Sequence, residues 1–117
     1  ALSFLTVDGA PMLHTLGMTG CSSLRVLSLR GAPALGMLDC GMASDLERLE
    51  IGDNMAVKAL DVGGCVSLTG WAVTTGALEK CDVVDLRGSG LAWELVGEAF
   101  PSNCVVHHDS ADECYHE

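Results

Sequence analysis

Residues 13–40 read LHTLGMTGCSSLRVLSLRGAPALGMLDC, and apolar residues recur in this stretch at a fixed interval of eleven positions. The pattern continues to residue 68, so that each unit reads L-x-x-L-x-L. The first column contains Leu13, Leu24, Leu35, Leu46, Val57 and Leu68. The second contains Leu16, Leu27, Leu38, Leu49, Leu60 and Trp71, and the third contains Met18, Leu29, Cys40, Ile51, Val62 and Val73. Such periodic self-similarity predicts a repeat architecture in which each unit packs on its neighbours.

The physical repeat is a pair of these units, because alternate units resemble each other more closely than neighbours do. The segment Gly9-Ala10-Pro11 recurs as Gly31-Ala32-Pro33, twenty-two residues further on. A single extended segment cannot bury its leucines alone, whereas a coil that goes out and returns can enclose them. We therefore expect a solenoid whose coils each contain an outgoing and a returning half.

The C-terminal part of the chain sets the phase of the coils. Leu91, Leu95, Val96 and Ala99 recur at helical spacing, which predicts a helix near 91–99 that Pro101 ends. Counting back from this helix places parallel strands near 13–19, 35–41, 57–63, 81–87 and 102–107. The return segments between them are expected to be mostly non-helical, and 68–80 is two residues longer than its predecessors.

Two segments carry a resemblance to a known family. Leu13-x-x-Leu16-x-Met18-x-x-Cys21 and Val57-x-x-Leu60-x-Val62-x-x-Cys65 resemble the leucine-rich repeat consensus L-x-x-L-x-L-x-x-N/C-x-L. The resemblance covers residues 2 to about 107, with repeats of about 20–24 residues. It implies a strand-rich fold, α/β by family convention, with a curved parallel sheet whose concave face commonly binds proteins. It also implies that the Asn/Cys column bonds to turn backbone. That column would contain Cys21, Ala43, Cys65, Ser89 and Asp109.

These patterns divide the chain into a solenoid and a tail. Residues 1–108 are expected to form the solenoid, without an N-terminal cap, and 109–117 an acidic tail. The segment from His107 to Glu117 carries imidazole, carboxylate and thiolate groups, which are all metal-ligand types. Their spacing matches no closed tetrahedral pattern, so we expect a solvated tail and no metal site.

Composition excludes several classes of function. Sixteen acidic and six basic residues give a net charge of -10, which argues against binding nucleic acid directly or docking on an anionic membrane. No apolar run approaches the ~20 residues of a transmembrane helix, so membrane insertion is not expected. The chain contains no phosphate-binding loop and no nucleophile elbow. The sequence therefore predicts neither an enzyme nor a cofactor.

The six cysteines do not form an evident disulfide framework. Cys40, Cys81 and Cys104 stand in apolar columns, and Cys21 and Cys65 lie forty-four residues apart. Two coils separate that last pair by roughly twice the ~4.8 Å strand spacing, which exceeds the ~7 Å limit for a bridge. Free buried thiols favour an intracellular, reducing compartment such as the cytoplasm or an organelle interior.

Exposed positions of the predicted strands offer one candidate binding surface. The column Gly17, Asp39, Asp61, Asp85 and Val105 contains three aspartates in successive coils. Stacked about 5 Å apart, these carboxylates would repel one another and would favour a partner with a basic surface. Met37, Lys58 and Arg87 flank this column and complete the candidate site. The alternative is that the aspartates form a solvated ridge with no binding role.

Three functions fit these observations. The first is a non-catalytic protein–protein interaction module of leucine-rich repeat type. The second is an accessory structural subunit within a large multiprotein or ribonucleoprotein assembly, since the first coil begins at Leu2 without a polar cap. The third is a cell-surface recognition domain, which free thiols at all six cysteines would exclude.

Overall fold

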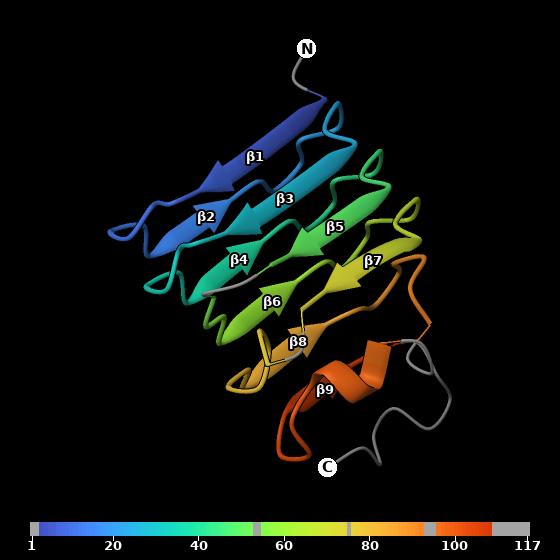
Figure 1. Cartoon of the computed structure of the whole chain (residues 1–117). Coiled ribbons are helices and arrows are strands. Elements are labelled where there is room, and N and C mark those ends of the chain that lie inside the picture. Colours follow the sequence, from blue (N-terminus) through green and yellow to red (C-terminus); the bar gives the residue numbers. More distant parts are fainter. Residues whose placement is uncertain (1–2, 53–54, 75, 93–95, 109–117) are drawn as a thin grey trace.

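The computed structural model describes residues 3–52, 55–74, 76–92 and 96–108, which form a β-solenoid (Figure 1). Sheet A has four parallel strands in the order β1 (Phe4–Asp8), β3 (Val26–Arg30), β5 (Arg48–Ile51) and β7 (Gly70–Val73). Sheet B has five parallel strands in the order β2 (Thr15–Gly17), β4 (Met37–Asp39), β6 (Ala59–Asp61), β8 (Val83–Asp85) and β9 (Val105–His107). Each of the first four coils contributes one strand to each sheet. β9 follows β8 in sheet B and forms its last strand.

The apolar columns of the sequence become the facing interiors of the two sheets. In sheet B, Leu16, Leu38 and Leu60 are in register, and in sheet A Leu27 and Leu49 are in register. Leu27, Leu38 and Leu49 are all fully buried. Successive side chains of a strand point to opposite faces, so the residues on either side of these leucines point outward.

The longer coil predicted from 68–80 is present. Leu60 pairs with Val84, twenty-four residues further on, whereas the other aligned pairs in sheet B are twenty-two residues apart. Trp71 pairs with Leu49 at the edge of sheet A, and its ring lies 6.1 Å from that of Phe100, tilted by 41°. Phe100 is buried, so it covers the apolar interior at this end of the stack.

Two sequence predictions require correction. The return segments are non-helical, as predicted. However, they contain β3, β5 and β7, which form a second parallel sheet together with β1, whereas the sequence predicted a single sheet. Near 91–99 the chain is non-helical at Leu91 and Ala92, α-helical at Val96 and 3₁₀-helical over Gly97–Ala99, so the predicted helix is present only in its last part among the described residues. Residues 93–95 of that predicted helix lie outside the described residues. Among the described residues, no helix has the length and apolar character to cross a membrane.

Turns after the strands of sheet B need a left-handed residue at one recurring position. Gly20, Gly64 and Gly88 have φ values of 73°, 78° and 74°, and Met42 takes the same place with φ 63°. Glycine adopts this conformation without steric cost, whereas a residue with a Cβ is strained there. The turn at Met42 is therefore the least favourable of these four.

Gly90 is required for a different reason, which is close contact between coils. A methyl group at this position would lie 2.5 Å from the carbonyl oxygen of Leu68 and 3.1 Å from that of Val66. We expect Gly90→Ala to lower the free energy of unfolding by about 1–3 kcal/mol, because neighbouring backbone must move. Urea unfolding measures this change. Gly36→Ala is the matched control, since nothing lies within 4 Å of its added methyl group. Equal stability of the two variants would contradict this packing.

Candidate functional site

The outer face of sheet B carries two rows of side chains that run across the strands. One row follows the first residue of each strand, and the other follows the last residue. Because the central residue of each three-residue strand points into the core, its two neighbours point outward. The rows therefore lie side by side on a single surface.

The structure brings the three predicted aspartates together in the row of last residues. Asp39 pairs with Asp61, and Asp61 pairs with Asp85, so the carboxylates occupy successive strands. All three side chains are half-buried. The predicted end of this row was wrong, because Asp85 pairs with His107 and not with Val105. The register of β9 was counted from Pro101, and the observed strand begins later than that count assumes.

Each aspartate also holds the turn that follows its strand. Asp39 Oδ1 accepts a hydrogen bond from the backbone N–H of Gly41 at 2.9 Å, and Asp61 Oδ1 accepts one from Gly63 at 2.8 Å. A methyl group on Gly41 would lie 3.1 Å from Asp39 Oδ1 and 3.7 Å from both carboxylate oxygens of Asp61. The glycines therefore leave the space into which the carboxylates fold, a role that the binding interpretation of these aspartates missed.

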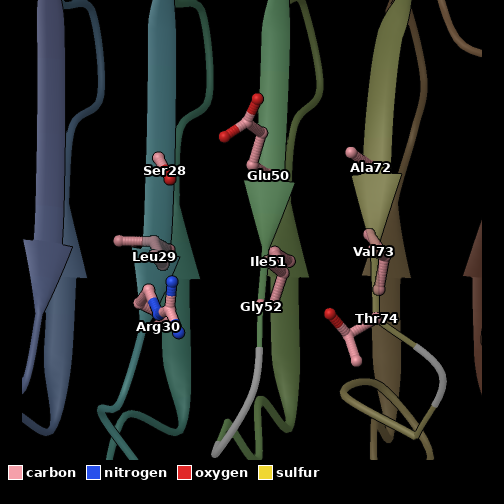
Figure 2. A pocket seen from close by; sticks show the side chains of 9 residues that line it. All are labelled: Ser28, Leu29, Arg30, Glu50, Ile51, Gly52, Ala72, Val73 and Thr74. Atoms are coloured by element: carbon pink, nitrogen blue, oxygen red, sulfur yellow. The ribbon is translucent and has the colours of Figure 1, made fainter.

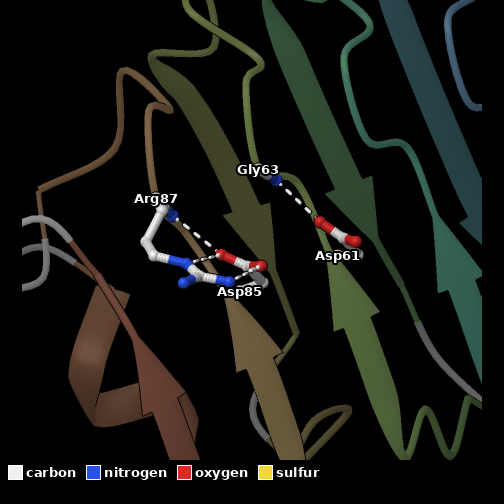
Figure 3. A network of polar contacts seen from close by, with 4 residues as sticks. All are labelled: Asp61, Gly63, Asp85 and Arg87. Carbon is white, nitrogen blue, oxygen red and sulfur yellow. Dashed lines mark hydrogen bonds and ion pairs between the residues drawn. The ribbon is translucent and has the colours of Figure 1, made fainter.

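Arg87 neutralises one end of the acidic row. Its backbone N–H, Nε and Nη2 donate to the Asp85 carboxylate at 3.0, 3.2 and 3.0 Å (Figure 3). These hydrogen bonds from Arg87 lower the pKa of Asp85, with a further contribution from the positive potential of His107. The equivalent position after Asp61 is Gly63, which donates its backbone N–H but has no guanidinium to pair with the carboxylate. The negative charge of the row is therefore concentrated at Asp39 and Asp61.

The parallel row of first residues is apolar. It comprises Met37, Ala59, Val83 and Val105 in register, preceded by Thr15. Met37 is 43% exposed and Val105 is 53% exposed, so the row ends in two accessible hydrophobic side chains. Lys58 is exposed immediately before β6, on the side of the apolar row away from Asp61. Lys58 thus lies at the margin of the surface and not among the carboxylates.

In the Asn/Cys column, two side chains form hydrogen bonds with backbone groups. The Cys65 thiol donates to the carbonyl oxygen of Cys40 at 2.9 Å, and the Ser89 hydroxyl accepts from the N–H of Leu91 at 3.3 Å. Ala43 has no polar side chain, and Asp109 lies outside the described residues. These bonds fasten the turns after β6 and β8, at the same end of the strands as the aspartates.

A groove on sheet A is a second candidate surface. It has a volume of about 410 Å³, and Ser28, Arg30, Glu50, Gly52, Ala72 and Thr74 are among its lining residues (Figure 2). Arg48 forms an ion pair with Glu50, and the hydrogen bond from Arg48 lowers the pKa of Glu50. Arg30 approaches Asp8 at 3.9 Å. Because its charges are largely paired within the sheet, this groove is a weaker candidate than the face of sheet B.

Possible metal ligands are not gathered into a site in the described ranges. Among residues 3–52, 55–74, 76–92 and 96–108, no group of three or more His, Cys, Asp or Glu side chains is placed to hold a metal ion. The possible ligands between Asp109 and Glu117 lie outside these ranges. The five described cysteines are free thiols.

Comparison of the chain with protein-family models, with curated proteins and with solved structures finds no match.

Proposed function

We propose that the chain is a non-catalytic protein–protein interaction module of leucine-rich repeat type, and that the outer face of sheet B binds a partner with a basic surface. The observation that carries the proposal is the pairing of an acidic row with an exposed apolar row on one face. Apolar side chains contribute burial, while complementary charge steers the partner and fixes its register.

The acidic row has a physical reason to prefer a cationic partner. Asp39 and Asp61 are aligned on adjacent strands, and such positions are about 5 Å apart. Two like charges at this distance repel, and a positive group placed against them lowers that repulsion. Arg87 already does this for Asp85, which illustrates the geometry that an arginine or lysine of a partner would reproduce at Asp39 and Asp61.

The size of the face limits the kind of complex. Five strands of three residues give a flat area of roughly 20 by 10 Å, well below the ~800 Å² per partner of a standard interface. A stable complex would also need the adjoining turns, where Met42 is 65% exposed and Val66 is 64% exposed. We therefore expect either a weak complex or a partner that extends over the turns after β4 and β6.

The test removes charge from the face while keeping the turns. In Asp39→Asn/Asp61→Asn/Asp85→Asn the amide oxygens can still accept the turn hydrogen bonds. After affinity capture identifies a partner, titration calorimetry is expected to show about 10–100-fold weaker binding by this variant. The matched control is Asp8→Asn/Asp45→Asn/Glu79→Gln, which changes the net charge equally at exposed positions outside the acidic row. Equal loss in both variants would overturn the proposed site.

One observation supports the alternative role as a structural subunit. In the first coil, Leu5, Leu13 and Leu16 are partly exposed, whereas their counterparts in the second coil, Leu27, Leu35 and Leu38, are fully buried. A coil or subunit stacked on this end would bury them. Sedimentation velocity distinguishes the roles, because a chain that stays monomeric at high concentration would count against this alternative. Mass spectrometry tests the cell-surface role separately, because six free thiols would exclude it.

A further inference from the structure

Cys81 and Cys104 are buried side by side in the last two coils of sheet B. They are 1% and 4% exposed, and each belongs to the apolar interior. Each also closes the same kind of turn, since the N–H of Cys81 donates to the carbonyl of Leu78 and that of Cys104 to the carbonyl of Pro101, both at 3.0 Å. The strands that follow, β8 and β9, are hydrogen-bonded neighbours.

The strand register defines how close the two cysteines are. Val83 pairs with Val105, and the N–H of Val105 donates to the carbonyl of Asp82 at 2.9 Å, so the pairing extends to the residues before both strands. Cys81 stands two residues before Val83, and Cys104 one residue before Val105. A lateral step of about 4.8 Å and an offset of one residue, about 3.3 Å, give a Cα separation of roughly 6 Å. This separation falls within the ~4.4–6.8 Å range of disulfides.

The two thiols also lie close enough for Cys104 to contribute to the raised pKa of Cys81. Each thiol donates to a backbone carbonyl of the strand that follows it, Cys81 to Val83 at 3.2 Å and Cys104 to Val105 at 3.7 Å. The other described cysteines are placed differently. Cys21 and Cys65 are two coils apart, and the Cys65 thiol is engaged by the backbone carbonyl of Cys40. Cys40 and Cys65 also lie in neighbouring coils, but Cys40 is level with Val62, three residues before Cys65, whereas Cys81 and Cys104 are offset by one residue.

We propose that Cys81 and Cys104 form a redox-active pair, which a small-molecule disulfide converts into an intramolecular disulfide that ties the last two coils together. One protein thiolate attacks a sulfur of the oxidant and releases the first small thiolate, which leaves a mixed disulfide. The second protein thiol loses its proton and attacks the protein sulfur of that mixed disulfide, releasing the second small thiolate. Two protein thiols are oxidised by two electrons, the oxidant is reduced to two small thiols, and the two protons pass to them.

Burial controls when this reaction occurs. Desolvation raises the pKa of Cys81 to about 12 and also raises that of Cys104, so the thiolate is scarce at neutral pH. Because the thiolate is the reacting species, the closed coil resists oxidation, and transient opening of the last coil admits the reagent. The disulfide is therefore a response to conditions that loosen this end of the solenoid. The inference does not depend on the proposed binding function.

The experiment uses the full chain carrying Cys114→Ser, which removes the one cysteine outside the described residues. The protein is incubated with oxidised glutathione at pH 8, a few degrees below its Tm, and is then alkylated and digested. Cleavage after Lys80 and Arg87 isolates Cys81 in the peptide 81–87, so mass spectrometry can identify its partner. We expect a linkage to Cys104 and a rise in Tm on the order of 10 °C that a reductant reverses.

Cys81→Val and Cys104→Val are the matched controls, since valine fills the corresponding interior position at Val57. Neither variant should show a change in Tm that depends on the oxidant. Recovery of both cysteines as alkylated thiols, persistence of a mixed disulfide with glutathione, or a linked form with no higher Tm would each overturn the proposal.

Discussion

Leu38→Ala is expected to lower the free energy of unfolding by about 2–5 kcal/mol, a large share of the stability of a domain of this size. Leu38 is fully buried in the central part of sheet B, aligned with Leu16 on one side and Leu60 on the other. Truncation removes apolar contacts and leaves a cavity. The hydrogen-bonded strands on both sides hold the surrounding backbone apart, so the cavity cannot close easily.

Met37→Ala is the matched control because Met37 is the preceding residue of the same strand and points outward. Its side chain is 43% exposed, so its truncation should cost less than about 1 kcal/mol. Urea unfolding followed by circular dichroism measures both variants. Similar losses would show that the assignment of inner and outer positions in β4 is wrong.

The alternation of buried and exposed residues along each strand also explains which features could be predicted from the sequence. Each predicted range 13–19, 35–41, 57–63, 81–87 and 102–107 contains one strand of sheet B. The prediction succeeded because coils stack in register, so a buried column appears in the sequence as a fixed interval. The longer coil before β8 was visible for the same reason, as a shift of the interval between Leu60 and Val84.

The second sheet was missed although its signal was present. The segments Leu27-Ser28-Leu29 and Leu49-Glu50-Ile51 alternate between apolar and polar residues, which is the strand period. The helix expected at 91–99 predicts one strand per coil, which assigns these segments to the return halves. Of the described residues in that range, Leu91 and Ala92 are not helical, whereas Val96 and the 3₁₀ helix Gly97–Ala99 are. Local spacing could not show how β9 would pair.

The alignment of the three aspartates was predictable from the sequence, whereas their role as a binding site stays a prediction. Asp39, Asp61 and Asp85 fell in register because they follow the apolar columns of β4, β6 and β8. Their bonds to the turns could have been anticipated from Asp39-Cys40-Gly41 and Asp61-Val62-Gly63, since an aspartate often accepts from an N–H two residues on. The alignment of His107 with Asp85 could not be anticipated from the sequence, because it depends on the tertiary packing of the last coil.

Raising the pH above about 9 is expected to lower the free energy of unfolding, because two buried thiols resist ionisation in the folded protein. Burial raises the pKa of Cys40 and of Cys81 from about 9 to about 12. Their stabilising contribution is complete below the unfolded-state value and is lost as the pH rises to the folded-state value, because the unfolded thiols ionise first. Each thiol costs about 1.4 kcal/mol per pH unit in this window, so the pair costs roughly 5 kcal/mol by pH 11.

Urea unfolding at pH 8, 9, 10 and 11, in the presence of a reductant, measures this slope. Cys40→Val/Cys81→Val should flatten it, since Val62 and Val57 occupy the equivalent interior positions of a neighbouring coil and show that valine fits. The chain has two lysines, Lys58 and Lys80, and one tyrosine. Burial also raises the pKa of Cys65 and of Cys104, so these two thiols leave a shallower residual slope in the double variant. A double variant that loses stability as steeply as the native chain would show that the two thiols are not the groups responsible. A flat profile in both proteins would mean that Cys40 and Cys81 ionise within the folded coils, which their burial between two hydrogen-bonded sheets opposes.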